Sequence, residues 1–386
     1  MLLLIGGIIA VVILPDSGYV PGFSMAKVWD APHEGDATDD GGEVRLAGDA
    51  VISSRSDGVT AFDVRSGKKR WEYAVPDRAE TCAMSSDPAA GVALVAYREA
   101  RPKEKGCVTV AAVDLADGRE LWRTDGVAAH FLDDVVTAGG GLGVLLDGDH
   151  LSAVDLKTGA QRWTVPLPKN CAPHALALAP EQLVAALMCG PEATLIAYDP
   201  ANGTARWTVP VDARRGVDEH AQLRVLSAVQ PVVQISAADG RTSAVLTYGP
   251  DGRSRARIAG TGDHGRLMST HVEGGRLFSS AWAGSGESTS FSRIVAFDLA
   301  TGAQLWRTKV AGNDFDVTDG RVTTVSAHRH GDLLTVLDAA TGDEKDDRSF
   351  RDAEVRSVAG MLTYQDLVIL VHADDTMPPF SVYERW

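Results

Sequence analysis

The sequence predicts an all-β protein, an eight-bladed β-propeller with four-stranded blades. Three observations lead to this prediction. A motif of eleven residues repeats along the chain, its copies are spaced by 40 to 51 residues, and a strand-like N-terminal segment can complete the last blade. Repeats of this period are typical of propellers, in which each unit is one small sheet.

The repeated motif reads Ala, an apolar residue, Asp, three residues, Gly, three residues and Trp, and it occurs five times without a gap. We interpret each copy as a β-hairpin, because the residues before Asp alternate as a half-buried strand does. The Asp side chain is expected to accept hydrogen bonds from turn amides, and the Gly supplies a positive φ. The Trp lies on the next strand, where its apolar face can dock on the neighbouring unit. The structural residues predicted in this way are Asp63, Gly67, Trp71, Asp114, Gly118, Trp122, Asp155, Gly159, Trp163, Asp199, Gly203, Trp207, Asp298, Gly302 and Trp306.

Two weaker copies and one partial copy bring the number of blades to eight. Residues 247–257 have a shorter turn and no Trp, and residues 336–346 keep Asp338 and Gly342 but have Asp346 where Trp is expected. Residues 381–385 form an eighth strand. Strand 27–31, which contains Trp29, is predicted to complete the blade of residues 354–385 and leave no open sheet edge. Seven blades is the main alternative, if one weak copy is not a blade.

Charge excludes one class of partner. The chain has 37 Lys and Arg residues against 52 Asp and Glu residues, a net charge of −15. A DNA-binding protein needs a basic surface that releases counterions, so we expect no nucleic acid partner. The acidic balance fits a soluble, monomeric propeller.

The N-terminus predicts a membrane attachment. Residues 1–14 contain no polar side chain. The run is shorter than the roughly 20 apolar residues that a transmembrane helix needs, and it lacks the positively charged start of a signal peptide. A translation start assigned too far downstream explains both the short apolar run and the missing positive charge. We interpret residues 1–25 as an uncleaved anchor with a linker and residues 26–386 as a single propeller domain. Secretion after signal cleavage is the alternative.

The four cysteines are predicted to form two disulfides. No Cys-x-x-Cys pair is present, so the sequence shows neither a zinc knuckle nor a redox motif. Cys171 precedes one predicted inner strand and Cys189 ends the next, and an antiparallel hairpin brings such residues together. Cys82 and Cys107 occupy similar places in another blade. Four free buried thiols, in a reducing compartment, are the alternative.

The repeat resembles the PQQ-like (pyrroloquinoline-quinone-like) β-propeller family, whose tryptophan-docking motif is similar to the Ala-x-Asp…Gly…Trp pattern over residues 26–386. Some members of that family are quinoprotein dehydrogenases that bind PQQ and calcium. Others are non-catalytic, such as the propeller lipoprotein of the outer-membrane β-barrel assembly machinery. The resemblance to short, membrane-anchored actinobacterial members implies the second kind, since the adjacent cysteines of the dehydrogenases are absent here.

Other residues are weaker candidates for chemistry. Four histidines, His130, His174, His220 and His271, fall near predicted inner strands and could hold a metal, but polar rim residues are the simpler interpretation. The same holds for His328 and His330. Residues 98–106 and 283–290 form longer loops, where functional residues concentrate.

We therefore predict a non-enzymatic scaffold on the outer side of the bacterial cytoplasmic membrane, with no cofactor. It is expected to bind an envelope protein or peptide through its blade loops. The alternative is a quinoprotein-type oxidoreductase with PQQ and calcium, or a sensor of a ligand or metal in the central cavity.

Overall fold

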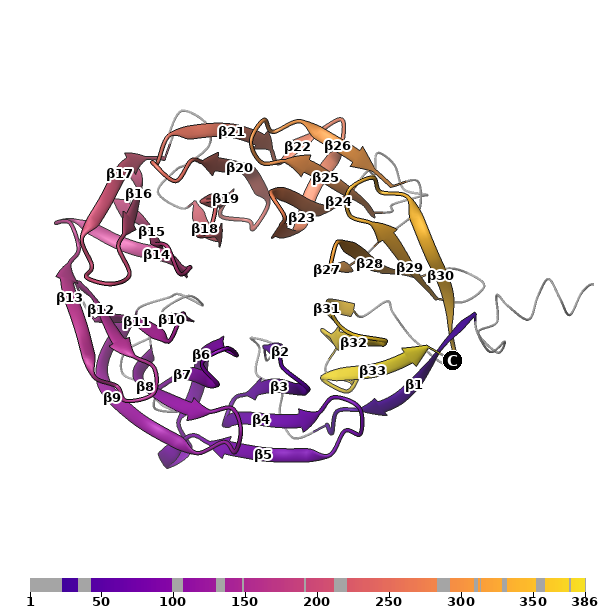
Figure 1. Ribbon diagram of the computed structural model, residues 1–386, viewed down its shortest axis with the longest axis horizontal. Helices are drawn as coiled ribbons and strands as arrows, with labels where there is room; N and C mark the ends of the chain where they lie inside the picture. Colours follow the sequence, from indigo (N-terminus) through magenta and orange to yellow (C-terminus); the bar gives the residue numbers. More distant parts are fainter. Residues whose placement is uncertain are drawn as a thin grey trace, which may run out of the picture.

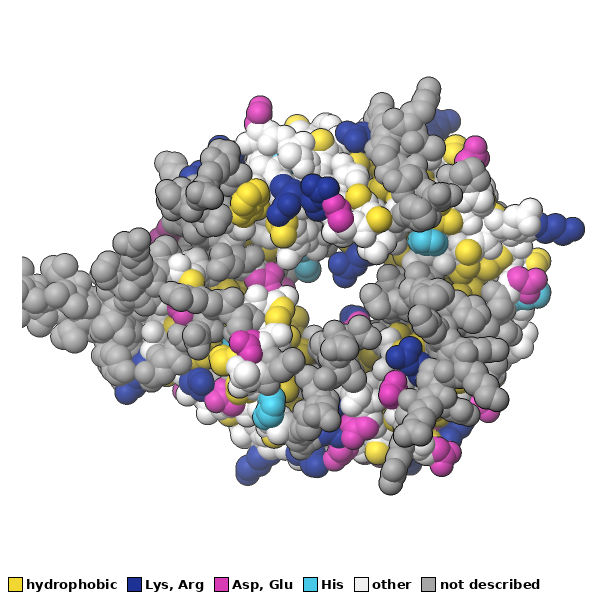
Figure 2. Space-filling view, turned by 180° about the vertical axis from the view of Figure 1, so that it is seen from behind, with side chains coloured by type: hydrophobic (Ala, Val, Ile, Leu, Met, Phe, Trp, Pro, Cys, Tyr) yellow, Lys and Arg dark blue, Asp and Glu magenta, His cyan; other side chains and the backbone are white. Residues whose placement is uncertain are grey.

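The protein is a ring of β-sheets around a central opening, as the computed structural model shows (Figures 1 and 2). The structure describes residues 23–33, 43–98, 107–129, 136–147, 149–190, 192–211, 221–282, 292–308, 312, 314–327, 332–351, 358–374 and 376–385. Their strands group into eight units of four, which we number as blades 1 to 8 along the chain. The prediction of an all-β, eight-bladed propeller is confirmed.

The strands of each blade follow one another from the opening outward (Figure 1). Blades 1 to 4 consist of β2 (Val44–Ala47), β3 (Ala50–Arg55), β4 (Gly58–Asp63) and β5 (Lys69–Ala74); β6 (Glu80–Asp87), β7 (Val92–Arg98), β8 (Cys107–Asp114) and β9 (Glu120–Ala129); β10 (Val136–Gly139), β11 (Leu142–Asp147), β12 (His150–Asp155) and β13 (Gln161–Pro166); and β14 (Cys171–Leu178), β15 (Leu183–Cys189), β16 (Glu192–Tyr198) and β17 (Ala205–Pro210). A 3-10 turn, Pro76–Arg78, joins blades 1 and 2.

Blades 5 to 8 complete the ring. They consist of β18 (Gln222–Ser227), β19 (Val232–Ser236), β20 (Thr242–Tyr248) and β21 (Ser254–Ala259); β23 (Gly265–Glu273), β24 (Arg276–Trp282), β25 (Ser292–Asp298) and β26 (Gln304–Arg307), preceded by the short β22 (Thr261–Gly262); β27 (Asp314–Thr318), β28 (Arg321–Ser326), β29 (Leu333–Asp338) and β30 (Glu344–Arg351); and β31 (Val358–Tyr364), β32 (Leu367–His372), β33 (Phe380–Arg385) and β1 (Ser24–Asp30).

Burial along the strands explains their composition. The second strand of a blade packs against neighbouring blades on both faces, so β7 and β15 are almost continuously apolar and buried. The outer strands β5 and β13 alternate between buried and exposed residues, because one face meets the next blade and the other meets solvent. The core is therefore distributed between the blades.

The N-terminal strand closes the ring, as predicted. β1 pairs antiparallel with β33, with Trp29 opposite Val382 and a bulge between Lys27 and Trp29. The strand begins at Ser24, three residues earlier than expected, and its other edge pairs parallel with β30 through Ser24 and Ser349. Blades 7 and 8 thus form one eight-stranded sheet, a link that the repeat pattern did not predict.

The two faces of the ring differ. On one face, which we call the turn face, the turn between the first and second strands of a blade meets the turn between its third and fourth strands. In blade 2, for example, the amide of Leu115 donates to the carbonyl of Gly91 at 2.9 Å. On the loop face, the outer strand of each blade ends and the inner strand of the next begins. There, the amide of Leu167 donates to the carbonyl of Asp149 at 2.7 Å. The connections between blades therefore depart from the loop face.

The described residues contain no helix long and apolar enough to cross a membrane. Most of the expected anchor, residues 1–22, lies outside the described part of the chain, as do residues 99–106 and 283–290 of the two long loops.

Candidate functional site

Tryptophans of the repeat link each blade to the next. The indole N–H of Trp71, on β5, donates to the carbonyl of Leu115 in blade 2 at 2.9 Å. Leu115 directly follows the motif residue Asp114. The same hydrogen bond recurs at 2.8 to 3.2 Å for Trp29, Trp122, Trp163, Trp207 and Trp306. In each case the acceptor is the carbonyl of the residue that follows the motif Asp position of the next blade. Six of the eight junctions are joined in this way.

The motif glycines receive these indoles. Gly118 has a φ of +73°, and a Cβ placed there would lie 2.7 Å from Cε3 of Trp71. Equivalent contacts face Gly67, Gly159, Gly203 and Gly342. The motif therefore requires glycine for two reasons: its backbone adopts a positive φ, and the indole ring approaches it closely.

The motif aspartates hold the turns. Asp155 accepts hydrogen bonds from the amides of Lys157 and Thr158 at 3.2 and 3.0 Å, and Arg162 donates to its second oxygen at 2.6 Å. Arg162 and Thr158 lower the pKa of the Asp155 carboxyl to about 2. Asp63 and Asp199 have the same arginine partner one residue before Trp, and their pKa values are also lowered by it. The repeat motif as defined from the sequence does not include this arginine, although Arg-Trp occurs in three of the five full copies.

The junction between blades 5 and 6 uses a hydroxyl in place of an indole. Ala256 stands at the Trp position, opposite Thr247. The buried Thr247 Oγ1 donates to the carbonyl of Leu299 at 2.7 Å, the same acceptor position that indoles use elsewhere. The amide of Ala256 in turn donates to Thr247 Oγ1 at 3.0 Å. The sequence contains a signal for this exchange, since Thr247 replaces the motif Ala.

The junction between blades 7 and 8 has neither group. Asp346 stands at the Trp position, opposite Val336, and lies 3.5 Å from the guanidinium of Arg385. A pocket of about 290 Å³ lies here, lined among others by Val336, Leu367 and Arg385. A second pocket, of about 330 Å³, lies beside Trp122 between blades 2 and 3. Both volumes are at the lower end of the range for small-molecule sites, which is roughly 300–1,000 Å³.

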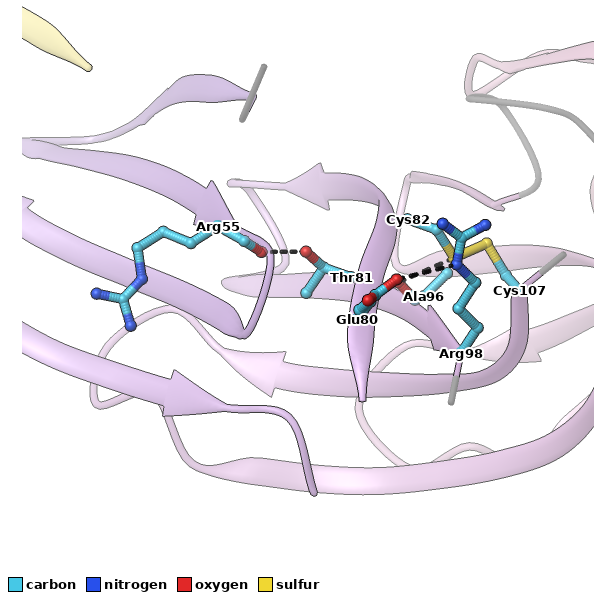
Figure 3. The surroundings of a disulfide bond; sticks show 7 residues. All are labelled: Arg55, Glu80, Thr81, Cys82, Ala96, Arg98 and Cys107. Carbon is cyan, nitrogen blue, oxygen red and sulfur yellow. Dashed lines mark hydrogen bonds and ion pairs between the residues drawn. A yellow bond between two sulfur atoms is a disulfide. The ribbon is translucent and has the colours of Figure 1, made fainter. Parts of the chain in front are cut away.

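Both predicted disulfides are present, at the loop face. Cys171 and Cys189 lie opposite each other on β14 and β15. Cys82, at a bulge of β6, reaches past β7 to Cys107 at the start of β8 (Figure 3). This bridge therefore spans two strands and differs from the adjacent-strand pair that the sequence suggested. Arg98 and Glu80 form an ion pair of 3.5 Å beside it.

The histidines do not assemble into a described metal site. His174 lies half-buried on β14, where desolvation lowers its pKa, and His271 on β23 lies 3.9 Å from Glu273. His130, His220, His328 and His330 lie outside the described residues. Within the described part of the chain, no three His, Cys, Asp or Glu side chains are grouped so that they could hold a metal ion. Figure 2 shows the opening bordered by several Lys and Arg side chains.

Comparison with known proteins extends this description. A model of the family described as outer membrane protein assembly factor BamB matches residues 91–249 and 235–377. The fold is similar to BamB from Moraxella catarrhalis, with a TM-score of 0.55 and 14% identity over 93% of this chain and 99% of that one. It is also similar to quinohemoprotein alcohol dehydrogenases: ADHIIG from Pseudomonas putida HK5 (TM-score 0.55, 12% identity, 96% and 79% covered) and one from Comamonas testosteroni (0.53, 14%, 94% and 75%). No curated protein matches the sequence.

The solved structures show the fold alone, because their identities are low and the fold is shared by BamB and by alcohol dehydrogenases. The family model is more specific, since it matches far more than half of the chain. This chain therefore belongs to the PQQ-like β-propeller repeat family described as outer membrane protein assembly factor BamB.

Proposed function

We propose that this protein is a non-enzymatic binding module that holds an envelope protein or peptide at the loop face of its propeller. The observation that carries the proposal is the asymmetry of the ring. The turn face consists of short turns hydrogen-bonded to one another, whereas the connections between blades depart from the loop face and both disulfides lie there. Rigid scaffolds that display loops on one face suit recognition of a partner.

The location proposed is the outer side of the bacterial cytoplasmic membrane, with the chain attached through its N-terminal segment. Two disulfides support an oxidising compartment, because cytosolic thiols are kept reduced. The family description, an assembly factor of the outer membrane, supports a role in the envelope. The propeller is proposed to act as a monomer, because β1 closes its sheet internally.

The first experiment is affinity purification of C-terminally tagged protein after crosslinking in native membranes. A stoichiometric envelope protein in the eluate is the expected result. A clean preparation without a partner, together with a saturable spectral change on titration with PQQ and calcium, would contradict the proposal and favour an oxidoreductase.

A further inference from the structure

The junction between blades 7 and 8 differs from every other described junction. Elsewhere an indole, or in one case the hydroxyl of Thr247, reaches the carbonyl that follows the motif position of the next blade. Here Asp346 is too short to do so, and the pocket of about 290 Å³ lies between the two blades. This pocket, on the turn face, lies apart from the loop-face contact proposed above, and neither proposal depends on the other.

The strand register makes this pocket equivalent to an indole site. Asp346 lies opposite Val336 as Trp71 lies opposite Ala61. In blade 8, Val382 lies opposite Trp29, which places Glu384 at the motif Asp position. Arg385 follows that position, so its backbone carbonyl corresponds to the carbonyls that accept the indole N–H at the other junctions. Arg385 also lines the pocket.

Five of the thirteen described residues that line the pocket are apolar, and the other eight are polar or charged. Its lining includes Met25 and Leu367, which are at most 1% exposed, and the nearly buried Leu334, Val336 and Val368. These side chains come from β1, β29 and β32, so they belong to three strands that the ring closure brings together. The lining thus combines apolar side chains, against which an aromatic ring can pack, with polar groups, and an indole ring with its N–H has both characters.

Charged side chains surround the mouth of the pocket, and two of its carboxylates are paired with arginines. Asp366 lines the pocket and pairs with Arg65 of blade 1 at 2.7 Å, and Arg385 lies 3.5 Å from Asp346. Asp319 and Arg321 add one charge of each sign. Arg348 lies closer to Asp346, at 2.9 Å, so four cations face three anions. Because Asp346 and Asp366 already have arginine partners within the protein, they do not require a charged ligand, and a neutral ring that carries a single polar N–H fits the mouth.

We propose that this pocket binds the indole side chain of a tryptophan in a partner polypeptide, which takes the place of the docking tryptophan that this chain lacks at residue 346. The indole lies between Val336 and Leu367 with its N–H directed toward the backbone at Arg385. Tryptophan is well suited to such a site, because buried aromatic anchors contribute most of the energy of many interfaces. The neighbouring charges then contact the peptide on either side of the ring.

The test uses a short peptide of glycines around one 5-fluorotryptophan, titrated with the full protein and followed by ¹⁹F NMR. We expect a saturable shift or broadening with the wild type. Asp346→Trp supplies the ring from the chain itself and is expected to abolish the effect. The matched control Asp347→Trp places an indole on the next, exposed residue of the same strand, and it is expected to leave peptide binding unchanged.

A second variant keeps the proposal testable if Asp346→Trp does not fold. Val336→Leu adds one methylene to the floor of the pocket and is expected to weaken peptide binding about fivefold or more. The proposal is overturned if the peptide gives no saturable change, or if Asp346→Trp or Val336→Leu folds and binds it as the wild type does. Binding of free 5-fluoroindole without binding of the peptide overturns it as well, since the site would then serve a small molecule.

Discussion

Replacement of Gly118 by alanine tests whether the indole contacts hold the ring together. Gly118 has a φ of +73°, and the new Cβ would lie 2.7 Å from Cε3 of Trp71. Gly91, in the same blade, has a φ of +71° and no atom within 4 Å of the position of its Cβ. The two variants therefore share the backbone cost of alanine in the left-handed region, and only Gly118→Ala also displaces an indole.

The expected magnitudes follow from these contacts. The left-handed conformation costs an alanine about 1–2 kcal/mol, partly offset by a gain of about 0.4–1 kcal/mol from the unfolded chain. In Gly118→Ala, relief of the clash requires the ring to retreat by roughly 0.5–1 Å, which forfeits a quarter to a half of its contact energy. Since removal of a buried Trp costs about 3–5 kcal/mol, this adds about 1–2 kcal/mol to the free energy lost by Gly118→Ala.

Urea unfolding followed by circular dichroism measures the difference. We expect Gly118→Ala to lower the free energy of unfolding by about 1–2 kcal/mol more than Gly91→Ala does. In a Trp71→Ala background the two variants should become equal, because no ring remains to be displaced. Equal losses in the wild-type background would refute the idea that docked indoles stabilise the blade junctions.

Three further predictions concern single interactions. Thr247→Val should lower the unfolding free energy by about 1–3 kcal/mol, because the carbonyl of Leu299 loses its donor, whereas Thr60→Val should be nearly neutral, since the buried Thr60 hydroxyl has no partner within the described residues. Urea titrations of both variants check this, and equal effects would contradict it. Burial raises the pKa of Asp314 to about 6, so its carboxyl favours folding at low pH and opposes it as the pH rises through that value. Asp314→Asn should therefore stabilise the protein by up to about 3 kcal/mol at pH 8 and by little at pH 4; unfolding curves at both pH values decide, and an equal gain at both would contradict the prediction. Removal of the Cys171–Cys189 bridge by paired serine substitution should cost about 3 kcal/mol, measured by thermal unfolding, and a melting temperature unchanged from the wild type would show that the bridge does not stabilise the fold.

The sequence predicted the ring because each repeat carries its own local signals. Asp and Gly specify the turn within one hairpin, and Trp specifies the contact with the next, so both follow from residues close together in the chain. The sequence also predicted closure by β1, because the strand that contains Trp29 has no blade of its own and the last blade lacks its outer strand.

Features that depend on contacts between distant strands were missed. The parallel pairing of β1 with β30 joins residues more than three hundred positions apart, and no local pattern encodes it. The pocket at Asp346 arises for the same reason, because its walls come from both ends of the chain. The Cys82–Cys107 bridge was paired correctly but placed on the wrong strands, since the bulge at Cys82 leaves no trace in the repeat.

Photo-crosslinking in native membranes tests whether the loop face is the binding surface, with the crosslinker placed at one residue on each face of blade 3. Lys169 is exposed at the loop face, and Lys157 is exposed in the Asp–Gly turn of the turn face. We expect a specific envelope protein to be crosslinked from position 169 but not from position 157. Crosslinks from position 157 alone, or from neither position, would contradict the assignment of the loop face as the binding surface.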